Sequence, residues 1–233
     1  MSKSGENEKP NIKELFPIFS SLNSDECEFI SNKISWIDSQ EGDTLFQQGA
    51  PGLGLYLLAR GQVKLCRRTP AGKNIIQKIV GPGEMLGVPT FFNKEKYTCY
   101  AKVMQASKVG FMQRNELFDF LKDKPQSLFS FLSYLSTELV IARIKLAEIA
   151  YQGSKQRISR LLAAIEEKGI SASRSELAQL TGVTYKTVIQ VLQEMKDREI
   201  VEIEEGEIEI VDREALGNIA DGFPLEIEGQ KLL

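Results

Sequence analysis

At 233 residues, the chain is long enough for one large domain or two modest ones, each with its own apolar core. It contains no His, which excludes a His-ligated haem, a His-based zinc site and a Ser-His-Asp triad. The formal net charge of −3 is unevenly spread, because residues 153–198 carry eight Lys and Arg against five acids, whereas residues 199–233 carry two against eleven. A mildly basic segment is therefore followed by a strongly acidic end.

The cysteines and the N-terminus predict the compartment. Cys27, Cys66 and Cys99 are widely spaced and form no CxxC motif, which is typical of a reducing compartment. Residues 1–10 are polar, lack the apolar core of a signal peptide, and are expected to form a flexible tail. No uninterrupted apolar run approaches the roughly 20 residues that a membrane helix needs. We therefore expect a soluble cytoplasmic protein with no membrane partner.

The first half of the chain changes from helix to strand. Residues 11–36 are predicted to be helical in pieces, with a helix starting at Ser24 that places Cys27 beside its apolar face, where packing is favoured over reactivity. From residue 37 to 113, short apolar runs alternate with glycine turns, one of them at Arg60-Gly61, which predicts an all-β roll. Asn115 is expected to cap a helix that reaches Leu121. The predicted strands are 44–46, 55–58, 63–66, 75–80, 100–104 and 108–112.

A long helix is predicted from Ser127 to Ala150. Pro125 precedes it, where proline is tolerated, and a heptad of apolar residues runs along it. One interpretation is a core helix of a single domain. The position of the helix, between a strand pattern and a helical pattern, favours a seam that pairs with a second copy of the chain. The seam residues are Leu128, Leu132, Leu135, Leu139, Ala142, Leu146 and Ile149.

The second half of the chain is predicted to be helical and to end in a hairpin. An amphipathic helix over 155–167 ends at Gly169. Ser173 and Glu176 have capping-box spacing at the start of a short helix, and Thr184 caps a further helix that runs to about Arg198. Residues 200–211 alternate apolar and acidic side chains around Glu205-Gly206, which predicts a β-hairpin.

Residues 174–193 are typical of a helix-turn-helix. The close approach of the two helices needs a small residue, here Ala178, and the turn needs a residue that accepts positive φ, here Gly182. The second helix buries Val188, Val191 and Leu192. Its opposite face carries side chains suited to base edges and phosphates, namely Tyr185, Lys186, Ile189, Gln190 and Gln193. The alternative is a helical hairpin in some other α domain.

The hairpin after the helix-turn-helix has the position of a wing. It is acidic, and its carboxylates would repel DNA phosphates. We therefore predict that the wing tip does not follow the DNA backbone closely. The acidic residues are Glu202, Glu204, Glu205, Glu207 and Glu209.

The order of these elements resembles that of the cyclic-AMP receptor protein/fumarate–nitrate reductase regulator (CRP/FNR) family, over about residues 16–216. The stretch 42–49, GDTLFQQG, continues through 55–58 to 61–64 and is similar to the glycine-marked signature of the cyclic-nucleotide-binding roll. The resemblance implies an α+β fold with an N-terminal cyclic-nucleotide-binding-type β-roll, a long dimerisation helix and a C-terminal winged helix-turn-helix. The implied divisions are a tail (1–10), a sensor roll (11–124), the dimerisation helix (125–152) and a DNA-binding domain (153–233).

The resemblance implies a homodimeric transcription regulator that binds a near-palindromic site in double-stranded DNA, with RNA polymerase as a further partner. Arg174 matches the family's phosphate-contacting arginine, and Thr184 opens the recognition helix. Tyr185, Lys186 and Gln190 match the three base-reading positions. The cyclic-AMP receptor protein has other residues there, so a different DNA sequence is expected.

The same resemblance implies an altered effector site. The family's nucleotide-binding members hold the ribose with a Gly-Glu pair and the cyclic phosphate with an Arg followed by Ser or Thr. Here Val88 replaces the Glu and Tyr97 replaces the Arg, while Gly87 and Thr98 match. Without the arginine, cyclic AMP loses its bidentate partner and is not expected to bind. The adjacent Lys96 is an alternative cation, although neighbouring residues of a strand point to opposite faces. The candidate pocket residues are Leu86, Gly87, Val88, Tyr97 and Thr98.

No cofactor or metal is expected. Three scattered cysteines do not match the four-cysteine iron–sulfur cluster of the family's oxygen sensors, and a haem has no His. A thiol switch between Cys66 and Cys99 is weighed against ordinary packing of strand cysteines. The sensor roll therefore either binds a small effector other than cyclic AMP or works without a ligand.

Three classes of function remain to be compared. The first is the DNA-binding regulator, and the second is an interaction protein that keeps the family fold but has lost specific DNA binding, which the acidic end motivates. The third is an enzyme, but no phosphate-binding glycine loop or paired carboxylates stand out, so no enzymatic activity is expected.

Overall fold

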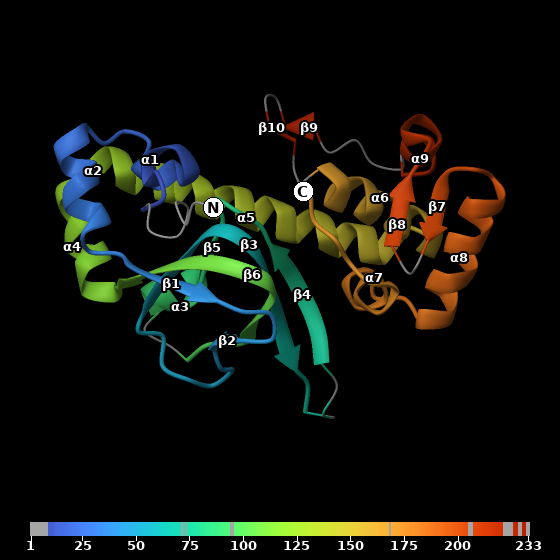
Figure 1. The fold of residues 1–233 in the computed structure, drawn as a ribbon, viewed down its shortest axis with the longest axis horizontal. Helices are drawn as coiled ribbons and strands as arrows, with labels where there is room; N and C mark the ends of the chain where they lie inside the picture. Colours follow the sequence, from blue (N-terminus) through green and yellow to red (C-terminus); the bar gives the residue numbers. More distant parts are fainter. Residues whose placement is uncertain are drawn as a thin grey trace, which may run out of the picture. The chain divides into compact units, whose positions relative to one another are not determined.

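The computed structural model describes residues 9–70, 72, 74–93, 96–167, 169–204 and 207–220, together with the backbone of β9 (Glu226–Ile227) and β10 (Gln230–Lys231). Residues 1–8 of the expected tail and the Glu205-Gly206 turn of the hairpin lie outside these ranges. The chain divides into two compact units, Met1–Leu135 and Ser136–Leu233 (Figure 1). The α+β fold predicted from the sequence is confirmed.

The first unit begins with short helices. These are α1 (Ile12–Leu15), the 3-10 helix η1 (Pro17–Phe19) and α2 (Ser24–Ser31). Asn23 caps α2, because its side chain accepts a hydrogen bond from the Glu26 N–H at 2.9 Å and the Glu26 carboxylate accepts one from the Asn23 N–H at 3.0 Å. This reciprocal capping fixes where α2 starts.

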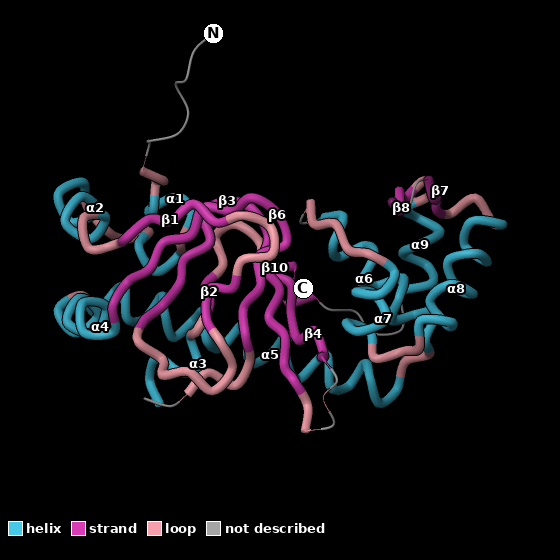
Figure 2. Tube along the Cα trace, turned by 60° about the horizontal axis from the view of Figure 1, so that its bottom comes forward, coloured by secondary structure: helices cyan, strands magenta, loops and turns pink. Residues whose placement is uncertain are grey.

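Six strands form one antiparallel sheet, drawn in magenta on the left of Figure 2. Its main order is β1-β6-β3-β4, while β2 pairs with β6 and β5 pairs with β3. The strands are β1 (Ser35–Ser39), β2 (Thr44–Phe46), β3 (Gly54–Arg68), β4 (Asn74–Val80), β5 (Met85–Leu86) and β6 (Tyr100–Gln113).

The turn expected at Arg60-Gly61 is wrong, because β3 runs through it without a break. Gly61 does have a positive φ of 94°, but this conformation serves an irregularity in the pairing of β3 with β6 rather than a chain reversal. A Cβ on Gly61 would lie 2.1 Å from the Ser107 Oγ, and that hydroxyl accepts a hydrogen bond from the Gln62 N–H. The close approach of two long strands therefore requires glycine here.

Helices complete the first unit. They are α3 (Val88–Asn93), α4 (Arg114–Asp123) and the N-terminal part of α5 (Pro125–Tyr151). The cap predicted for α4 is wrong, since Gln113 occupies the N-cap position and Asn115 lies inside the first turn. Aromatic rings pack beneath these helices, with the centroids of Phe19 and Phe120 5.7 Å apart.

The second unit is a small helical domain with a two-stranded hairpin. Its apolar core joins the helices that follow α5 to the hairpin around Ile158, Leu177, Val188 and Leu216, which are almost fully buried. After the C-terminal part of α5, its elements are α6 (Ser154–Glu167), α7 (Arg174–Thr181), α8 (Tyr185–Asp197), β7 (Val201–Glu204), β8 (Glu207–Ile210) and α9 (Arg213–Ala220).

Candidate nucleic-acid interface and effector pocket

The turn between α7 and α8 has the conformation that the sequence predicts. Ser173 caps α7 in a capping box with Glu176. Gly182 ends the helix with φ 68° and ψ 25°, and the N–H groups of Gly182 and Val183 both donate to the carbonyl of Ala178. Ala178 itself is only 8% exposed. The small residue and the left-handed glycine thus bring the two helices together.

The helix α8 separates its apolar and polar side chains cleanly. Thr184 is its N-cap and accepts a hydrogen bond from the Thr187 N–H at 3.1 Å. No acid occupies its first turn, so the positive end of the helix dipole is not neutralised locally. One face is buried, with Val188, Val191, Leu192 and Met195. The other face is exposed, with Tyr185, Lys186, Ile189, Gln190 and Gln193.

The remaining predicted DNA contact begins α7. Arg174 is the first residue of that helix and is half-buried. The structure therefore places Arg174, Thr184, Tyr185 and Lys186 in the first turns of two packed helices, with Gln190 one turn further along α8. Helix N-termini and cations in this arrangement suit phosphate binding beside base contacts.

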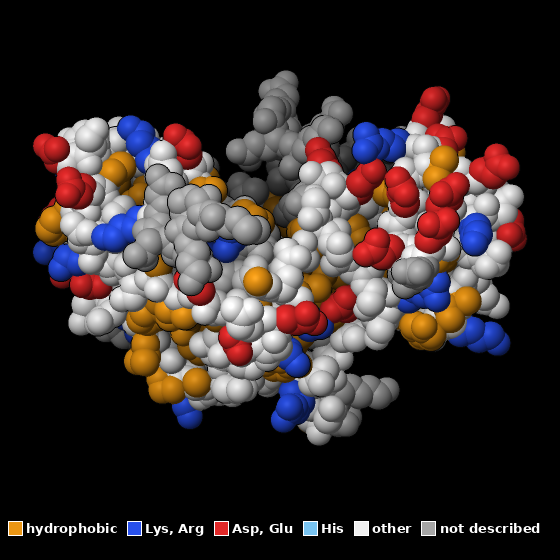
Figure 3. Space-filling view, viewed as in Figure 1, with side chains coloured by type: hydrophobic (Ala, Val, Ile, Leu, Met, Phe, Trp, Pro, Cys, Tyr) orange, Lys and Arg blue, Asp and Glu red, His pale blue; other side chains and the backbone are white. Residues whose placement is uncertain are grey.

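The acidic wing lies next to the recognition helix. In the β7–β8 ladder Glu202 lies opposite Glu209 and Glu204 lies opposite Glu207. Like charges directly across a ladder destabilise a hairpin. Acidic side chains also gather over this hairpin and α9 in Figure 3.

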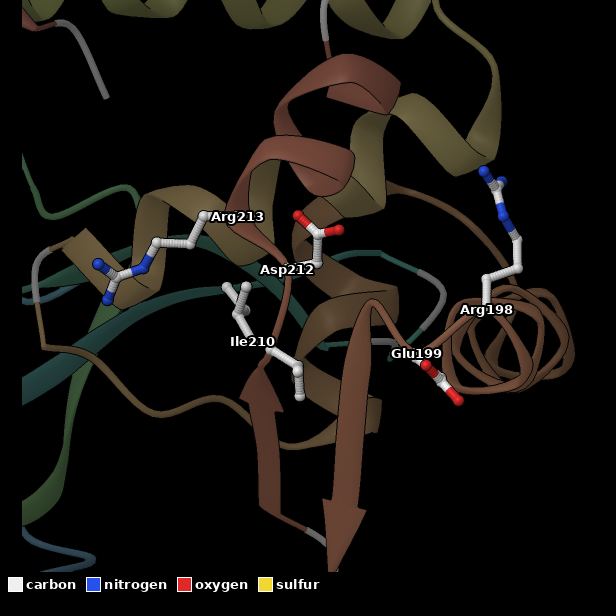
Figure 4. Close-up of a pocket in the computed structure, with 6 residues that line it drawn as sticks. Arg198, Glu199, Ile210, Asp212 and Arg213 are labelled. Carbon is white, nitrogen blue, oxygen red and sulfur yellow. The ribbon is translucent and has the colours of Figure 1, made fainter.

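A shallow pocket lies at the base of the wing (Figure 4). The side chains of Arg198 and Arg213 point away from one another across it, so they do not form a common anion site. Arg213 instead donates to the Glu166 carboxylate at 2.9 Å, and Asp212 accepts from the Ala215 N–H at 2.8 Å. These charged groups therefore serve local structure.

Tyr97, which the sequence resemblance aligns with a phosphate-binding arginine, is part of an aromatic cluster. Its ring stacks on Phe46 with centroids 4.0 Å apart and an interplanar angle of 20°, and Phe46 in turn lies 5.4 Å from Tyr56. Tyr97 is 5% exposed and its hydroxyl donates to the Gly54 carbonyl at 3.3 Å. Burial raises the pKa of Tyr97 to about 12, so the phenol is neutral at physiological pH.

The other candidate pocket residues are brought together only in part. Leu86 shares the apolar cluster of Tyr97, and an added Cβ on Gly87 would lie 3.2 Å from the Tyr97 ring. Val88 starts α3 and packs into a different apolar cluster, while Thr98 is exposed. The structure thus brings Leu86, Gly87 and Tyr97 into one apolar region and leaves Val88 and Thr98 outside it.

Arg114 also contacts this region, although the sequence does not predict it. This residue opens α4, donates to the Thr90 carbonyl of α3, and lies over the Phe91 ring with its guanidinium carbon 6.0 Å from the centroid. No local motif marks it, because its partners come from a distant helix. Its contacts hold α3, and hence the neighbourhood of Gly87, in place.

The cysteines are free thiols. Cys66 is buried in β3, and Cys99 precedes Tyr100, which lies opposite Cys66 in the β3–β6 ladder. Burial, with a smaller contribution from Cys66, raises the pKa of Cys99 to about 11. A thiol that stays protonated at neutral pH is a poor nucleophile, which favours the packing role over the switch.

The helix α5 exposes much of the predicted seam. Leu139 is 52%, Leu146 69% and Ile149 58% exposed. The sequence predicts no membrane helix, because no uninterrupted apolar run is long enough. However, an 18-residue window of α5 has a mean hydropathy of 1.3 and is 11% buried. By length and composition alone, α5 could therefore cross a membrane. Serines, Thr137 and a few charged residues interrupt the apolar runs, but they leave the average over the window high. An apolar helix with this exposure is typical of a surface that contacts another protein or a membrane.

Comparison with known proteins identifies both halves of the chain. Residues 37–124 match the cyclic nucleotide-binding domain, and residues 156–219 match the Crp-like helix-turn-helix domain. The chain belongs to the CRP/FNR family of transcription regulators. Its second unit carries the family's helix-turn-helix DNA-binding domain.

Relatives of this CRP/FNR protein match over most of their length. A CRP-like cAMP-activated global transcriptional regulator of Mycobacterium tuberculosis is 26% identical over 202 residues, covering 82% of this chain and 90% of the relative. The anaerobic regulatory protein of Bacillus subtilis is 24% identical over 208 residues, covering 84% and 87%. Both are named as regulators rather than enzymes.

A solved structure supports the fold. A CRP/FNR-family transcriptional regulator from Thermus thermophilus aligns with a TM-score of 0.70 at 22% identity, covering 81% of this chain and 99% of the other. At that identity the likeness concerns the fold alone.

Proposed function

We propose that this CRP/FNR protein is a homodimeric, sequence-specific DNA-binding transcription regulator that acts in the cytoplasm on RNA polymerase. The observation that carries the proposal is the α7–α8 geometry. Gly182 and Ala178 pack the two helices, and α8 is left with a polar, cation-bearing face. Arg174 holds a phosphate, while Tyr185, Lys186 and Gln190 reach base edges in the major groove.

The dimer forms through the α5 seam. Exposed leucines at heptad spacing are the surface that a second α5 would cover. Burying the exposed half of Leu139 contributes about 1 kcal/mol per copy. Leu139→Lys should therefore raise the dimer dissociation constant at least about 30-fold in analytical ultracentrifugation without detergent.

The matched control for Leu139→Lys is Ser133→Lys, on the side of α5 away from the seam. It should leave the dimer intact. Two outcomes contradict the seam: a full-strength dimer for Leu139→Lys, or wild-type protein that requires detergent and partitions into vesicles. The second outcome would make α5 a membrane helix.

The roll of this protein does not bind cyclic AMP. The support is Tyr97, whose neutral, buried ring stacks on Phe46 and offers no cation to a cyclic phosphate. The roll instead takes a small effector of another kind or works without one.

The deciding experiment is selection of genomic DNA fragments by purified, reduced protein with no ligand added. One enriched, near-palindromic motif would support the proposal and would make the ligand-free dimer competent. Binding to that motif should also weaken steeply with rising salt, because each phosphate contact releases a counterion.

The acidic wing favours a second candidate, an interaction protein that keeps the fold without specific DNA affinity. Glu202 and Glu209, paired across the hairpin, motivate it. Salt dependence separates the two candidates, since an interaction protein would show no enriched motif and no steep loss of DNA binding between about 50 and 200 mM salt. If selection yields no motif, a screen of metabolites against the roll comes next, because an inactive ligand-free state would give the same result until an effector is added.

A further inference from the structure

One apolar side chain lies within the polar face of α8. Ile189 is 42% exposed and lies outside the apolar cluster that the described residues of the second unit form, although the other aliphatic residues of α8 are buried. Tyr185, one turn earlier on the same face, is 51% exposed.

The position of Ile189 matters more than its exposure, because single exposed aliphatic residues are common on protein surfaces. At about 100° per residue, Ile189 lies about 40° around the helix axis from Tyr185, and Gln190 lies about 140° from Tyr185 in the same direction. Ile189 is therefore inside the arc between two residues assigned to base reading. A groove floor that contacts both Tyr185 and Gln190 must also meet Ile189.

A major groove offers one apolar feature to such a side chain, the C5-methyl group of thymine. Opposite any other base, Ile189 would cover a polar edge atom without giving it a hydrogen-bond partner, which is unfavourable. Lys186 and Gln190, on the same polar face, supply polar contacts to neighbouring bases but cannot recognise a methyl group.

We infer that Ile189 is a specificity-determining residue that selects thymine through its methyl group at one position of each half-site. The inference rests on the proposed DNA-binding function and adds the chemistry of one base. It predicts a thymine at a fixed place in the selected motif, next to the base pairs read by Lys186 and Gln190.

The test replaces thymine by deoxyuridine in the selected duplex, one position at a time and in both half-sites together. This change removes the methyl group and keeps every hydrogen-bonding group. For wild-type protein, one substitution should weaken binding about fourfold per half-site and roughly 15-fold when made in both.

Ile189→Ala should bind the thymine and deoxyuridine duplexes equally. The matched control, Ile75→Ala, changes an isoleucine of similar exposure (44%) on β4 of the roll and should keep the wild-type preference for thymine.

The outcomes separate the inference from the proposed function. A motif whose binding does not depend on any thymine methyl group overturns the inference and leaves DNA binding intact. A methyl dependence that persists in Ile189→Ala overturns it also, and assigns the contact to another residue such as Tyr185. Absence of any motif, with and without added metabolites, overturns both.

Discussion

Glu199 provides a test of how the recognition helix is joined to the wing. It follows α8 with φ 57°, and is the one residue other than glycine with positive φ in the described part of the chain. The Glu199 N–H donates to the Lys196 carbonyl and the Ile200 N–H donates to the Met195 carbonyl. This is the hydrogen-bonding pattern of a helix C-terminus at which glycine usually occupies the position of Glu199.

The expected effect of Glu199→Gly follows from three contributions. A left-handed residue other than glycine costs about 1–2 kcal/mol. Glycine offsets about 0.5–1 kcal/mol of this gain in stability, because it loses more conformational entropy on folding than Glu does. Removing a carboxylate from the negative end of the helix dipole contributes about 0.3–1 kcal/mol. We expect Glu199→Gly to raise the free energy of unfolding by about 1 kcal/mol.

The assay is urea and thermal unfolding followed by circular dichroism at the helix band. For a unit the size of Ser136–Leu233, the midpoint should rise by about 4–8 °C. Glu199→Gln is the control, because it removes the charge but keeps the strained backbone, and should recover only the dipole part. Equal or lower stability of Glu199→Gly would refute the reasoning and show that Glu199 is not strained.

Three further predictions concern DNA, acid and ligand. Lys186→Ala and Gln190→Ala should each weaken binding to the selected site by about 1–3 kcal/mol in fluorescence anisotropy, and equal losses on random duplex would show that they do not read bases. A hydrogen bond from Lys124 lowers the pKa of Glu26 below 4.5. The Lys124–Glu26 contact therefore stabilises the fold above pH 4.5, and this stabilisation is lost as the pH falls through the lowered pKa. In pH-dependent unfolding, Glu26→Gln should be less stable than wild type at neutral pH, and the gap should close in acid; a constant gap would contradict this. Cyclic AMP should leave the unfolding temperature unchanged at any concentration, because Tyr97 offers no cation to its phosphate. A rise that depends on the concentration of cyclic AMP would contradict this prediction.

The features predicted correctly from the sequence are those with local causes. Ser173, Gly182 and Thr184 form caps and turns with partners three or four residues away, so a short stretch of sequence specifies them. The long helix likewise follows from periodicity within one segment.

The features missed depend on distant partners. Gly61 has the conformation of a turn residue, and only the approach of Ser107 on another strand makes it a bulge inside β3. Tyr97 stacks on Phe46, which no local pattern links to it. Glu148 of α5 forms an ion pair with Arg160 of α6 at 3.2 Å. The two residues lie on different helices, so no pattern within one helix predicts their contact.

The acidic wing has a consequence for how quickly a regulator of this kind finds its site. Non-specific affinity for DNA is almost entirely electrostatic, whereas specific affinity also includes base contacts. Repulsion from the paired carboxylates of Glu202 and Glu209 therefore removes a larger fraction of the total binding free energy from a non-specific complex than from an operator complex. An equal repulsion in both complexes lowers both affinities and leaves their ratio unchanged, but it shortens the time that a regulator with such a wing spends on each competing genomic sequence.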